Sequence, residues 1–228
     1  PAVVINFAAE SHVDRSLDDS APFKRTNVEG TRVLLEMAKR YNVRKYIQIS
    51  TDEVYGDIGP DGEPTDETAP INPGNPYSQS KADADALVQN STVPWCITRC
   101  TNNYGPHQFP EKFIPVMATK AMNGEKLPVY GDGQQIRDWI HVSDHCRGIL
   151  RVAEDGVPGN VYNFGGDNEQ RNIDVAIAIL RTLAKPEDYL SYVEDRKNHD
   201  FRYAIDFRKA ERELNWVPVV RWENGLID

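Results

Sequence analysis

Tyr77 and Lys81 are the first residues of this sequence whose types and spacing point to chemistry, in the string Tyr77-Ser78-Gln79-Ser80-Lys81. On a helix, side chains at positions i and i+4 lie on the same face. A free tyrosine has a pKa of about 10 and is a poor base at neutral pH, but a nearby lysine cation stabilises the phenolate. The pair could then take a proton from an alcohol while a hydride leaves the same carbon. The alternative is an exposed helix that carries both residues by chance, and the spacing alone favours that alternative.

Two neighbouring carboxylates form a second candidate site. Thr51-Asp52-Glu53 follows a predicted strand that ends at Ser50. Adjacent residues of a strand point to opposite faces, so both carboxylates reach one site only if the chain turns there, and Gly56 is consistent with a turn. Neighbouring carboxyl groups in different surroundings can divide acid and base roles, because the second proton is harder to remove. A solvated acidic turn is the alternative.

The elements that must position these residues alternate between strands and helices in the N-terminal half. Strands are predicted at 3–9, 46–50 and 95–98, and helices at 81–88 and along the apolar stripe Val28, Leu34, Leu35, Ala38 and Tyr41, which we interpret as core. Apolar runs rich in β-branched residues suit strands buried on both faces. The alternation predicts a parallel α/β sheet with right-handed crossovers. Residues 57–74 are rich in Gly, Pro and Asp and are predicted to form a loop.

After Tyr104 prolines punctuate the sequence and the predicted elements become shorter. Helices are predicted near 112–123, 143–153 and 173–184, and strands near 127–130 and 161–164. We interpret the fold as α/β, with a Rossmann-like parallel sheet and a smaller mixed α/β substrate domain. The first domain is predicted to comprise 1–104, joined by a segment near 143–165, and residues 105–228 mainly form the second. Ligands of open α/β sheets bind at the carboxyl ends of the strands, so the second domain is expected to cover that edge.

Composition and charge exclude several classes of function. Hydrophobic residues make up 39% of the chain and charged residues 27%, as in soluble globular proteins. A net charge of −9 without a long basic stretch argues against nucleic acid or an anionic membrane surface as a partner. No apolar run approaches the ~20 residues of a membrane span, and the N-terminal residues do not resemble a signal peptide. The 3 cysteines are too few for a disulfide framework and favour a reducing cytoplasm.

The glycines do not predict a nucleotide-binding turn. A dinucleotide-binding fold normally begins with a strand, a Gly-rich turn and a helix, and residues 1–228 contain no such start. The string 56–62 has glycines at 56, 59 and 62, but its two aspartates and its proline would repel a pyrophosphate, and no apolar helix follows. We predict that it is only a loop. Either the N-terminal βα units of a Rossmann-like fold are missing from this sequence, or the fold does not bind a nucleotide.

Two other kinds of catalytic site find little support. His141 and His145 stand four residues apart, as zinc ligands on a helix do, but no Glu follows His141 and no third ligand is evident. No Gly-x-Ser-x-Gly string marks a hydrolase nucleophile. We therefore predict no metal site.

Several motifs, each weak alone, occur in an order that is typical of a known family. They are the strings at 6–14 (Asn-Phe-Ala-Ala-Glu-Ser-His-Val-Asp), 50–56 (Ser-Thr-Asp-Glu-Val-Tyr-Gly), 77–81, 102–106 (Asn-Asn-Tyr-Gly-Pro), 137–139 (Arg-Asp-Trp), 162–166 (Tyr-Asn-Phe-Gly-Gly) and 202–206 (Arg-Tyr-Ala-Ile-Asp). With them the chain resembles, over essentially its whole length, the extended short-chain dehydrogenase/reductase family and its NAD-dependent sugar epimerase and dehydratase group. Asp52 is the most informative residue, because the epimerases and decarboxylases of this family usually carry Ser or another small residue there.

The resemblance implies a lyase that uses NAD to dehydrate dTDP-glucose to dTDP-4-keto-6-deoxyglucose, a step of deoxysugar formation. In the family, C4 of the hexose is oxidised, water is eliminated across C5 and C6, and the hydride returns to C6. By resemblance, Tyr77 deprotonates the C4 hydroxyl, Lys81 lowers the pKa of Tyr77, and Thr51 hydrogen-bonds the C4 oxygen. Glu53 would remove the C5 proton, and a protonated Asp52 would donate to the departing C6 hydroxyl.

The resemblance also implies contacts with cofactor, substrate and a second subunit. Cofactor contacts are implied at Ala8, Ala9, Thr26, Tyr77, Lys81 and Asn103. Substrate contacts are implied at Ser11, Asn102, Lys112, Phe113, Pro128, Val129, Tyr130, Arg137, Asn172 and His199. Arg137 and Lys112 could pair with the diphosphate and Tyr130 could line the base pocket, although a salt bridge with Asp138 is an alternative role for Arg137. A homodimer is implied through the helices near 24–41 and 77–90.

The sequence departs from the family pattern in three places, and it leaves alternatives open. The Gly-rich turn is absent, Lys197-Asn198 stands where the family usually has Pro-Gly, and the stretch 88–95 is a few residues shorter than expected. The alternatives are a related epimerase or decarboxylase, a UDP-glucose 4,6-dehydratase, and a truncated, non-catalytic relative that binds a sugar nucleotide. Thymine and uracil differ by one methyl group, worth only ~1 kcal/mol in an apolar pocket, so the sequence does not decide the base.

Overall fold

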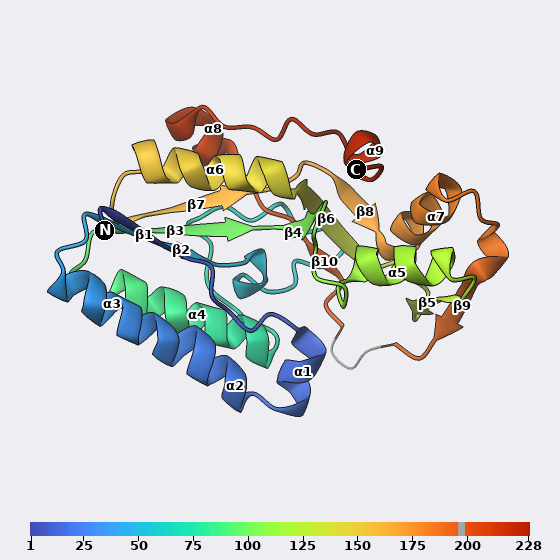
Figure 1. The fold of residues 1–228 in the computed structure, drawn as a ribbon, viewed down its shortest axis with the longest axis horizontal. Helices are drawn as coiled ribbons and strands as arrows, with labels where there is room; N and C mark the ends of the chain where they lie inside the picture. Colours follow the sequence, from blue (N-terminus) through green and yellow to red (C-terminus); the bar gives the residue numbers. More distant parts are fainter. Residues whose placement is uncertain (196–198) are drawn as a thin grey trace.

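A four-stranded parallel sheet with the order β1-β2-β3-β7 forms the centre of the first part of the molecule (Figure 1). The structure, a computed structural model, describes residues 1–195 and 199–228, so the departure at Lys197-Asn198 lies outside the described residues. The strands are β1 (Val3–Asn6), β2 (Lys45–Ile49), β3 (Trp95–Cys100) and β7 (Asn160–Phe164). All three strand pairs are parallel, which confirms the predicted parallel α/β sheet.

Helices cover both faces of this sheet. On one face lie α3 (Gly30–Arg40) and α4 (Pro76–Gln89), and on the other lie α6 (Val142–Asp155) and α8 (Arg208–Leu214) (Figure 1). Successive residues of β2 belong to different hydrophobic clusters. Tyr46 packs in one cluster with Leu35 and Ala38, and Ile47 packs in another with Trp216. Burial on both faces explains why neighbouring residues of these strands are both apolar, as in Tyr46 and Ile47, instead of alternating with exposed polar residues.

The first sheet differs from the prediction at two boundaries. α3 follows α2 (Ala21–Phe23) and a π-helix, η1 (Lys24–Glu29), and it ends at Arg40. Tyr41 lies beyond that end and is 65% exposed, so its prediction as a core residue was wrong. Asn42 follows with φ 50, and the turn carries Tyr41 away from the buried face of the helix. β1 likewise stops at Asn6 instead of Ala9, and Phe7 is exposed.

The second part of the molecule contains two smaller sheets. One has the order β10-β6-β4 with β8 paired to β6, and the other pairs β5 with β9. The elements are β4 (Asn102–Tyr104), β5 (Leu127–Tyr130), β6 (Ile136–His141), β8 (Glu169–Arg171), β9 (Leu190–Val193), β10 (Arg202–Tyr203), α5 (Phe113–Met122) and α7 (Asn172–Thr182). The helices α5 and α7 and the strand β5 agree with the predicted ranges, whereas the other strands of this part were not predicted. α5 and α7 share a core that includes Met117, Ala121 and Ile179.

A single residue separates the two parts where the chain first crosses between them. β3 ends at Cys100 and β4 begins at Asn102, and β4 pairs with β6 of the second sheet. Later segments return to the first sheet, since β7 pairs with β3, and Ala210 and Leu214 of α8 belong to its core. The division into domains 1–104 with 143–165 and 105–228 stays a proposal.

Residues 57–74 form the predicted loop and contain no helix or strand. The loop is held against β10: the Asp57 carboxylate accepts the backbone N–H groups of Phe201 and Arg202 at 2.9 and 3.0 Å. The Arg202 guanidinium in turn donates to the backbone oxygen of Gly62 at 2.6 Å. The glycine string is therefore a loop fastened to a strand, as predicted.

The remaining short elements are α1 (Val13–Asp18), η2 (Asp52–Val54), η3 (Glu187–Tyr189) and α9 (Trp222–Gly225). α4 and β3 are joined directly by residues 90–94, the stretch that is shorter than the family pattern. Within the ranges 1–195 and 199–228, no helix has both the length and the apolar character of a membrane span.

Candidate active site

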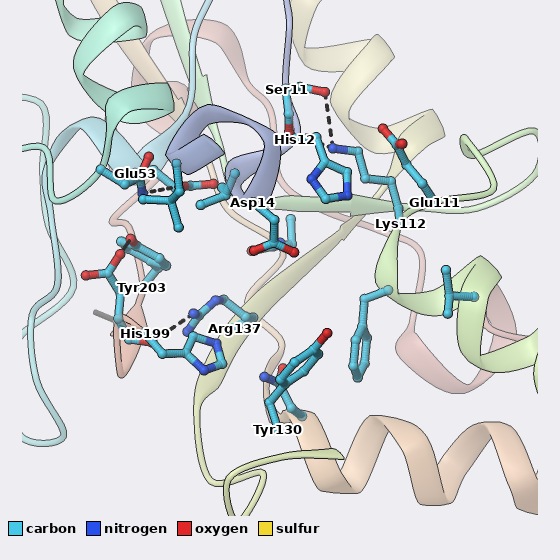
Figure 2. Close-up of a pocket in the computed structure, with 18 of the residues that line it drawn as sticks. Ser11, His12, Asp14, Glu53, Glu111, Lys112, Tyr130, Arg137, His199 and Tyr203 are labelled. Carbon is cyan, nitrogen blue, oxygen red and sulfur yellow. Dashed lines mark hydrogen bonds between the residues drawn. The ribbon is translucent and has the colours of Figure 1, made fainter. Parts of the chain in front are cut away.

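The carboxyl ends of β1, β2 and β3 lie at the edge of the first sheet that faces the second part of the molecule (Figure 1). A cavity of about 380 Å³ lies at this edge, lined by residues that follow each of the three strands, such as Ser11, Glu53 and Asn102 (Figure 2). Every residue predicted to contact the substrate lines this cavity: Ser11, Asn102, Lys112, Phe113, Pro128, Val129, Tyr130, Arg137, Asn172 and His199. The position agrees with the rule that open α/β sheets bind ligands at their carboxyl edge.

A tight turn after β2 keeps the two carboxylates together. Thr51 caps the short helix η2: its Oγ1 accepts the backbone N–H of Glu53 at 3.3 Å and donates to Asp52 Oδ1 at 3.1 Å. Gly56 ends the turn with φ 86, and a Cβ there would lie 2.3 Å from the backbone oxygen of Asn72. The turn that the sequence required for a shared site is therefore present, and it needs a glycine.

The buried surroundings of Asp52 favour its protonated form. The residue is 3% exposed, and its Oδ2 has no hydrogen-bond partner among the described residues. Burial, followed by the charge of Glu53, raises the pKa of Asp52 to about 8. A carboxyl group with this pKa is protonated at neutral pH and can donate its proton.

The Glu53 side chain, unlike that of Asp52, lines the cavity (Figure 2). One of its oxygens, Oε2, accepts a hydrogen bond from Asn75 Nδ2 at 3.3 Å. Burial raises the pKa of Glu53, while the hydrogen bond from Asn75 and the charge of Arg137 lower it. The pKa of each of the two adjacent carboxyl groups is thus raised by burial, and Glu53 differs in having an amide donor that favours its carboxylate form.

Helix α4 presents Tyr77 and Lys81 on its buried face. Asn75 caps the helix through a capping box with Ser78. Pro76 occupies the first helical position, where no backbone N–H is needed for a hydrogen bond within the helix. Both Tyr77 and Lys81 are buried, which confirms that they share one face. The exposed helix considered as an alternative is therefore excluded.

The pKa of Tyr77 shifts in the direction opposite to the expected one. Burial raises it well above its ordinary value, and the charges of Glu53 and Asp52 add to the increase, while a hydrogen bond with Thr51 opposes it. The lowering of this pKa by Lys81 stays a prediction, because the causes of the rise are burial and the neighbouring carboxyl groups. The Lys81 ammonium instead donates to the backbone oxygen of Ile49 at 2.7 Å.

A buried ion pair lies behind Lys81. Asp85, one turn further along α4, accepts hydrogen bonds from Arg99 of β3 at 3.1 Å and from Ser50 at 3.0 Å. Burial lowers the pKa of Lys81, and the charge of Asp85 opposes that change. The Asp85 carboxylate thus favours the charged form of Lys81, and the Asp85–Arg99 pair was not predicted from the sequence.

The residues predicted to contact the cofactor lie beside the cavity rather than in its lining. They are Ala8 and Ala9 after β1, Thr26 on η1, Tyr77 and Lys81 on α4, and Asn103 on β4. The buried Asn27 joins three of these segments: its amide makes hydrogen bonds with both backbone groups of Glu10, at 2.8 and 3.0 Å, and donates to Ser80 Oγ at 2.8 Å. The loop after β1, the π-helix and α4 are thus fixed against one another.

Two cations face the cavity from opposite elements (Figure 2). Lys112 at the start of α5 donates to the backbone oxygen and to Oγ of Ser11, at 2.7 and 3.1 Å. Arg137 on β6 donates to the backbone oxygen of Asp200 at 2.8 Å, and its guanidinium lies 4.7 Å from the centre of the Tyr203 ring. The alternative salt bridge with Asp138 is not formed, because the Asp138 carboxylate accepts backbone N–H groups of the turn 166–168.

Some residues of the cavity were not predicted. They include His12, Asp14, Asn75, Glu111, Asp200 and Tyr203. Tyr203 donates a hydrogen bond to the Asp200 carboxylate, and burial raises the pKa of the Tyr203 phenol. The only sequence signal for Asn75 was its position before Pro76, which is typical of a helix start and says nothing about Glu53.

His141 and His145 each contact a protein side chain through Nδ1. His141 Nδ1 lies 2.7 Å from Ser143 Oγ, and His145 Nδ1 lies 2.9 Å from Asn103 Oδ1. Burial lowers the pKa of His145 to about 4, so this imidazole is neutral. Across the described part of the chain, no group of three or more ligating side chains is placed to hold a metal ion.

Comparison with known sequences finds similarity over almost the whole chain. The sequence model of the family described as GDP-mannose 4,6 dehydratase matches residues 1–228. A protein of Neisseria meningitidis serogroup B named dTDP-glucose 4,6-dehydratase is 46% identical over 250 residues, which cover 99% of this chain and 70% of that protein. A protein of Escherichia coli with the same name is 44% identical over 258 residues, covering 99% of this chain and 71% of its own length.

Solved structures resemble the fold closely. DesIV, a dTDP-glucose 4,6-dehydratase from Streptomyces venezuelae with NAD and TYD bound, superimposes with a TM-score of 0.96 at 43% identity, covering 99% of this chain and 70% of that one. A UDP-glucuronic acid 4-epimerase from Bacillus cereus, in complex with UDP-glucuronic acid and NAD, gives a TM-score of 0.93 at 27% identity, with coverage of 99% and 73%. The sequence is thus nearer to these dehydratases than to this epimerase.

Proposed function

The chain belongs to the GDP-mannose 4,6 dehydratase family, and from this membership we propose that it dehydrates dTDP-glucose to dTDP-4-keto-6-deoxyglucose with NAD. The relatives that are 46% and 43% identical carry the name of this activity. The observation that carries the proposal is the Asp52–Glu53 pair, in which burial favours a protonated Asp52 and the neighbouring Glu53 lines the cavity with an amide donor on its carboxyl group. An elimination needs an acid and a base side by side. An epimerase has no leaving hydroxyl to protonate.

The residues present fit the nicotinamide half of NAD. Lys81 is a buried ammonium with three N–H donors, and its hydrogen bond to Ile49 accounts for one of them. We propose that Lys81, Tyr77 and Asn103, with Thr26 and the loop at Ala8 and Ala9, hold the cofactor. NAD supplies the hydride acceptor for C4 and afterwards the hydride donor for C6. No contact with its pyrophosphate is assigned to these residues.

Tyr77 and Thr51 act on the C4 oxygen in the proposed first step. Tyr77 takes the C4 hydroxyl proton, and Thr51 hydrogen-bonds the same oxygen. Because Asp52 and Glu53 raise the pKa of Tyr77, a protonated Asp52 helps the step by removing one of the two negative charges nearby. The carboxylate of Asp85, which is paired with Arg99 and buried, supports the cationic form of Lys81.

Glu53 and Asp52 perform the proposed elimination. A ketone at C4 acidifies the C5 proton, which Glu53 removes. Asp52 donates its proton to the departing C6 hydroxyl, and water leaves. The turn after β2 keeps the two groups adjacent, so base and acid reach neighbouring carbons of the sugar.

Charged and aromatic residues of the cavity are proposed to hold the nucleotide. Arg137 can meet the diphosphate as a planar fork and Lys112 as a point charge. Phe113 and Tyr130, with Pro128 and Val129 of β5, provide apolar surface for the base. Ser11, Asn102, Asn172 and His199 complete the proposed contacts. Thymine is proposed over uracil on the names of the relatives.

We propose a homodimer through the helices near 24–41 and 77–90. Val33 and Met37, four residues apart on α3, are 55% and 38% exposed, and Tyr41 follows at 65%. This apolar stripe lies on the side of α3 turned away from the sheet. A second copy of the chain would cover it.

Assay of the protein with NAD tests the function. We expect dTDP-glucose to give a product with the alkaline absorbance of a 4-keto-6-deoxy sugar, identified by NMR as having a methyl group at C5. UDP-glucose in a parallel assay tests the choice of base. Binding of dTDP-glucose, measured by calorimetry, without product from either sugar would favour the non-catalytic alternative.

A further inference from the structure

Asn75 contacts both halves of the catalytic machinery at once. Its Oδ1 accepts the backbone N–H of Ser78 at 2.9 Å, which caps the helix that carries Tyr77 and Lys81. Its Nδ2 donates to Glu53 Oε2 at 3.3 Å. One short side chain therefore joins the start of α4 to the carboxylate that follows β2, and it lies in the lining of the cavity.

The orientation of the Asn75 amide follows from its partners. A backbone N–H can only donate, so the Ser78 N–H must face the amide oxygen. The NH₂ group then has to point to Glu53, whose carboxylate can only accept. Ser78 Oγ closes the capping box by accepting the Asn75 backbone N–H at 3.1 Å, which fixes the backbone from which the amide extends.

We propose that Asn75 is a positioning residue for the dehydration, which holds the Glu53 carboxylate at the cavity and in fixed register with Tyr77. The inference rests on the proposed function, since it assigns Glu53 the role of base. Asp cannot replace Asn75 in this role although it is an equally good cap, because a carboxylate has no donor for Glu53.

Several titratable or charged groups act on Glu53 in addition to the neutral amide of Asn75. They limit how far the loss of that amide can change the pKa of Glu53. They are Asp52 and Tyr77 of the catalytic group, Arg137 on β6, Lys112 at α5, and Asp200 and Tyr203 near β10. Loss of one donor removes only part of the stabilisation of the carboxylate. We therefore expect a shift of ~0.5–1 unit in the acid limb of the pH–rate profile.

Two variants separate positioning from capping. Asn75→Ser and Asn75→Asp keep an N-cap acceptor but lose the amide donor. We expect unchanged KM, roughly tenfold lower kcat at neutral pH, an acid limb of kcat/KM moved to higher pH, and a Tm close to that of the wild type. The shift should be larger for Asn75→Asp, because the added negative charge further disfavours the Glu53 carboxylate.

Ser78→Ala is the matched control. It removes the other side chain of the capping box without touching Glu53. We expect a lower Tm with an unmoved acid limb. If Ser78→Ala shifts the acid limb as much as Asn75→Ser does, the effect is one of helix capping and the positioning role is overturned.

A measurement that does not depend on turnover tests the role of Asn75 separately from the proposed function. NMR of protein with ¹³C-labelled glutamate carboxyl groups gives the pKa of Glu53, assigned by the signal missing in Glu53→Gln. A higher pKa in Asn75→Ser supports the inference even if dTDP-glucose is not the substrate, and an unchanged pKa overturns it. Absence of product from the wild type overturns the function, whichever result the NMR titration gives.

Discussion

At the scale of single residues, two neighbouring carboxyl groups of the site differ in their partners. Asp52 has one side-chain partner, Thr51, and an oxygen without any partner among the described residues. Glu53 lies at the cavity with the Asn75 amide and the charge of Arg137. The two carboxyl groups thus have different surroundings, and the proposed acid role of Asp52 can be tested by one substitution.

Asp52→Asn should leave oxidation at C4 possible and slow the elimination by ~10²-fold or more, because the leaving hydroxyl loses its proton donor. The amide side chain of the variant keeps the acceptor for Thr51, so the turn should persist. Product formation and transfer of solvent deuterium to C5 are measured in parallel. Dehydration at the wild-type rate would contradict the role of Asp52.

The raised pKa of Asp52 also predicts a dependence of stability on pH. The native protein holds a proton with a pKa of about 8 that the unfolded chain loses near its ordinary value of 3.8. Native Asp52 therefore binds more protons than unfolded Asp52 between these values, and its contribution to stability falls as pH rises through that window. The amide that replaces this carboxyl group in Asp52→Asn does not titrate. The Tm of the variant should therefore rise relative to the Tm of the wild type between pH 5 and pH 9. A constant Tm difference over this range would show that Asp52 is not protonated in the fold.

The sequence identified the proposed catalytic residues but not the contacts that support them. Thr51, Asp52, Glu53, Tyr77 and Lys81 carry recognisable types at fixed spacings. The Asp85–Arg99 pair joins a helix to a strand, and neither residue has a local pattern that names the other. The pKa of Tyr77 depends on burial and on carboxylates brought in by the turn after β2, which a helical spacing cannot reveal.

At the scale of elements, the turn after β2 and the start of α4 set the geometry of the site. η2 holds the carboxylates, α4 holds the Tyr–Lys pair, and the hydrogen bond between Asn75 and Glu53 joins them. Gly56 allows the turn because its φ is 86 and because its Cα faces the backbone of Asn72.

Gly56→Ala should lower stability by roughly 2–4 kcal/mol and reduce activity, because the new Cβ meets a backbone oxygen and the conformation is strained. Gly59→Ala is the control: Gly59 also has a positive φ, 67, but nothing lies within 4 Å of a Cβ there. We expect that control to lose only about 1 kcal/mol. Denaturant unfolding of both variants makes the comparison, and equal losses would show that the close approach to Asn72 is unimportant.

Elements of the first sheet were easier to predict than those of the second. Strands buried on both faces leave apolar runs, as in Tyr46 and Ile47, which are fully buried. β6 instead contains Arg137, which lines the cavity, and Asp138, which accepts hydrogen bonds from the turn 166–168. β10 has only two residues. Such strands show neither an apolar run nor an alternation, so only the fold reveals them.

At the scale of the whole molecule, the proposed dimer predicts that Met37→Asp gives monomers. A charge on the exposed stripe of α3 would have to be buried in the interface, which is unfavourable. Leu150→Asp, on α6 at the other face of the sheet, is the control, since Leu150 is also exposed, at 57%. Light scattering after size exclusion measures the mass. A monomeric wild type, or a dimeric Met37→Asp variant, would contradict the proposed interface.

The return of β7 and α8 to the first sheet has a consequence for how the protein is made. When the ribosome has released β3, that strand still has an unpaired edge, because its neighbour β7 comes only at Asn160 and the core residue Trp216 later still. Unpaired edges recruit foreign strands, and contacts distant in sequence form slowly. The nascent chain is thus exposed to aggregation until almost the last helix emerges. A fragment cut at residue 104 should precipitate rather than fold, however natural that boundary looks in the sequence.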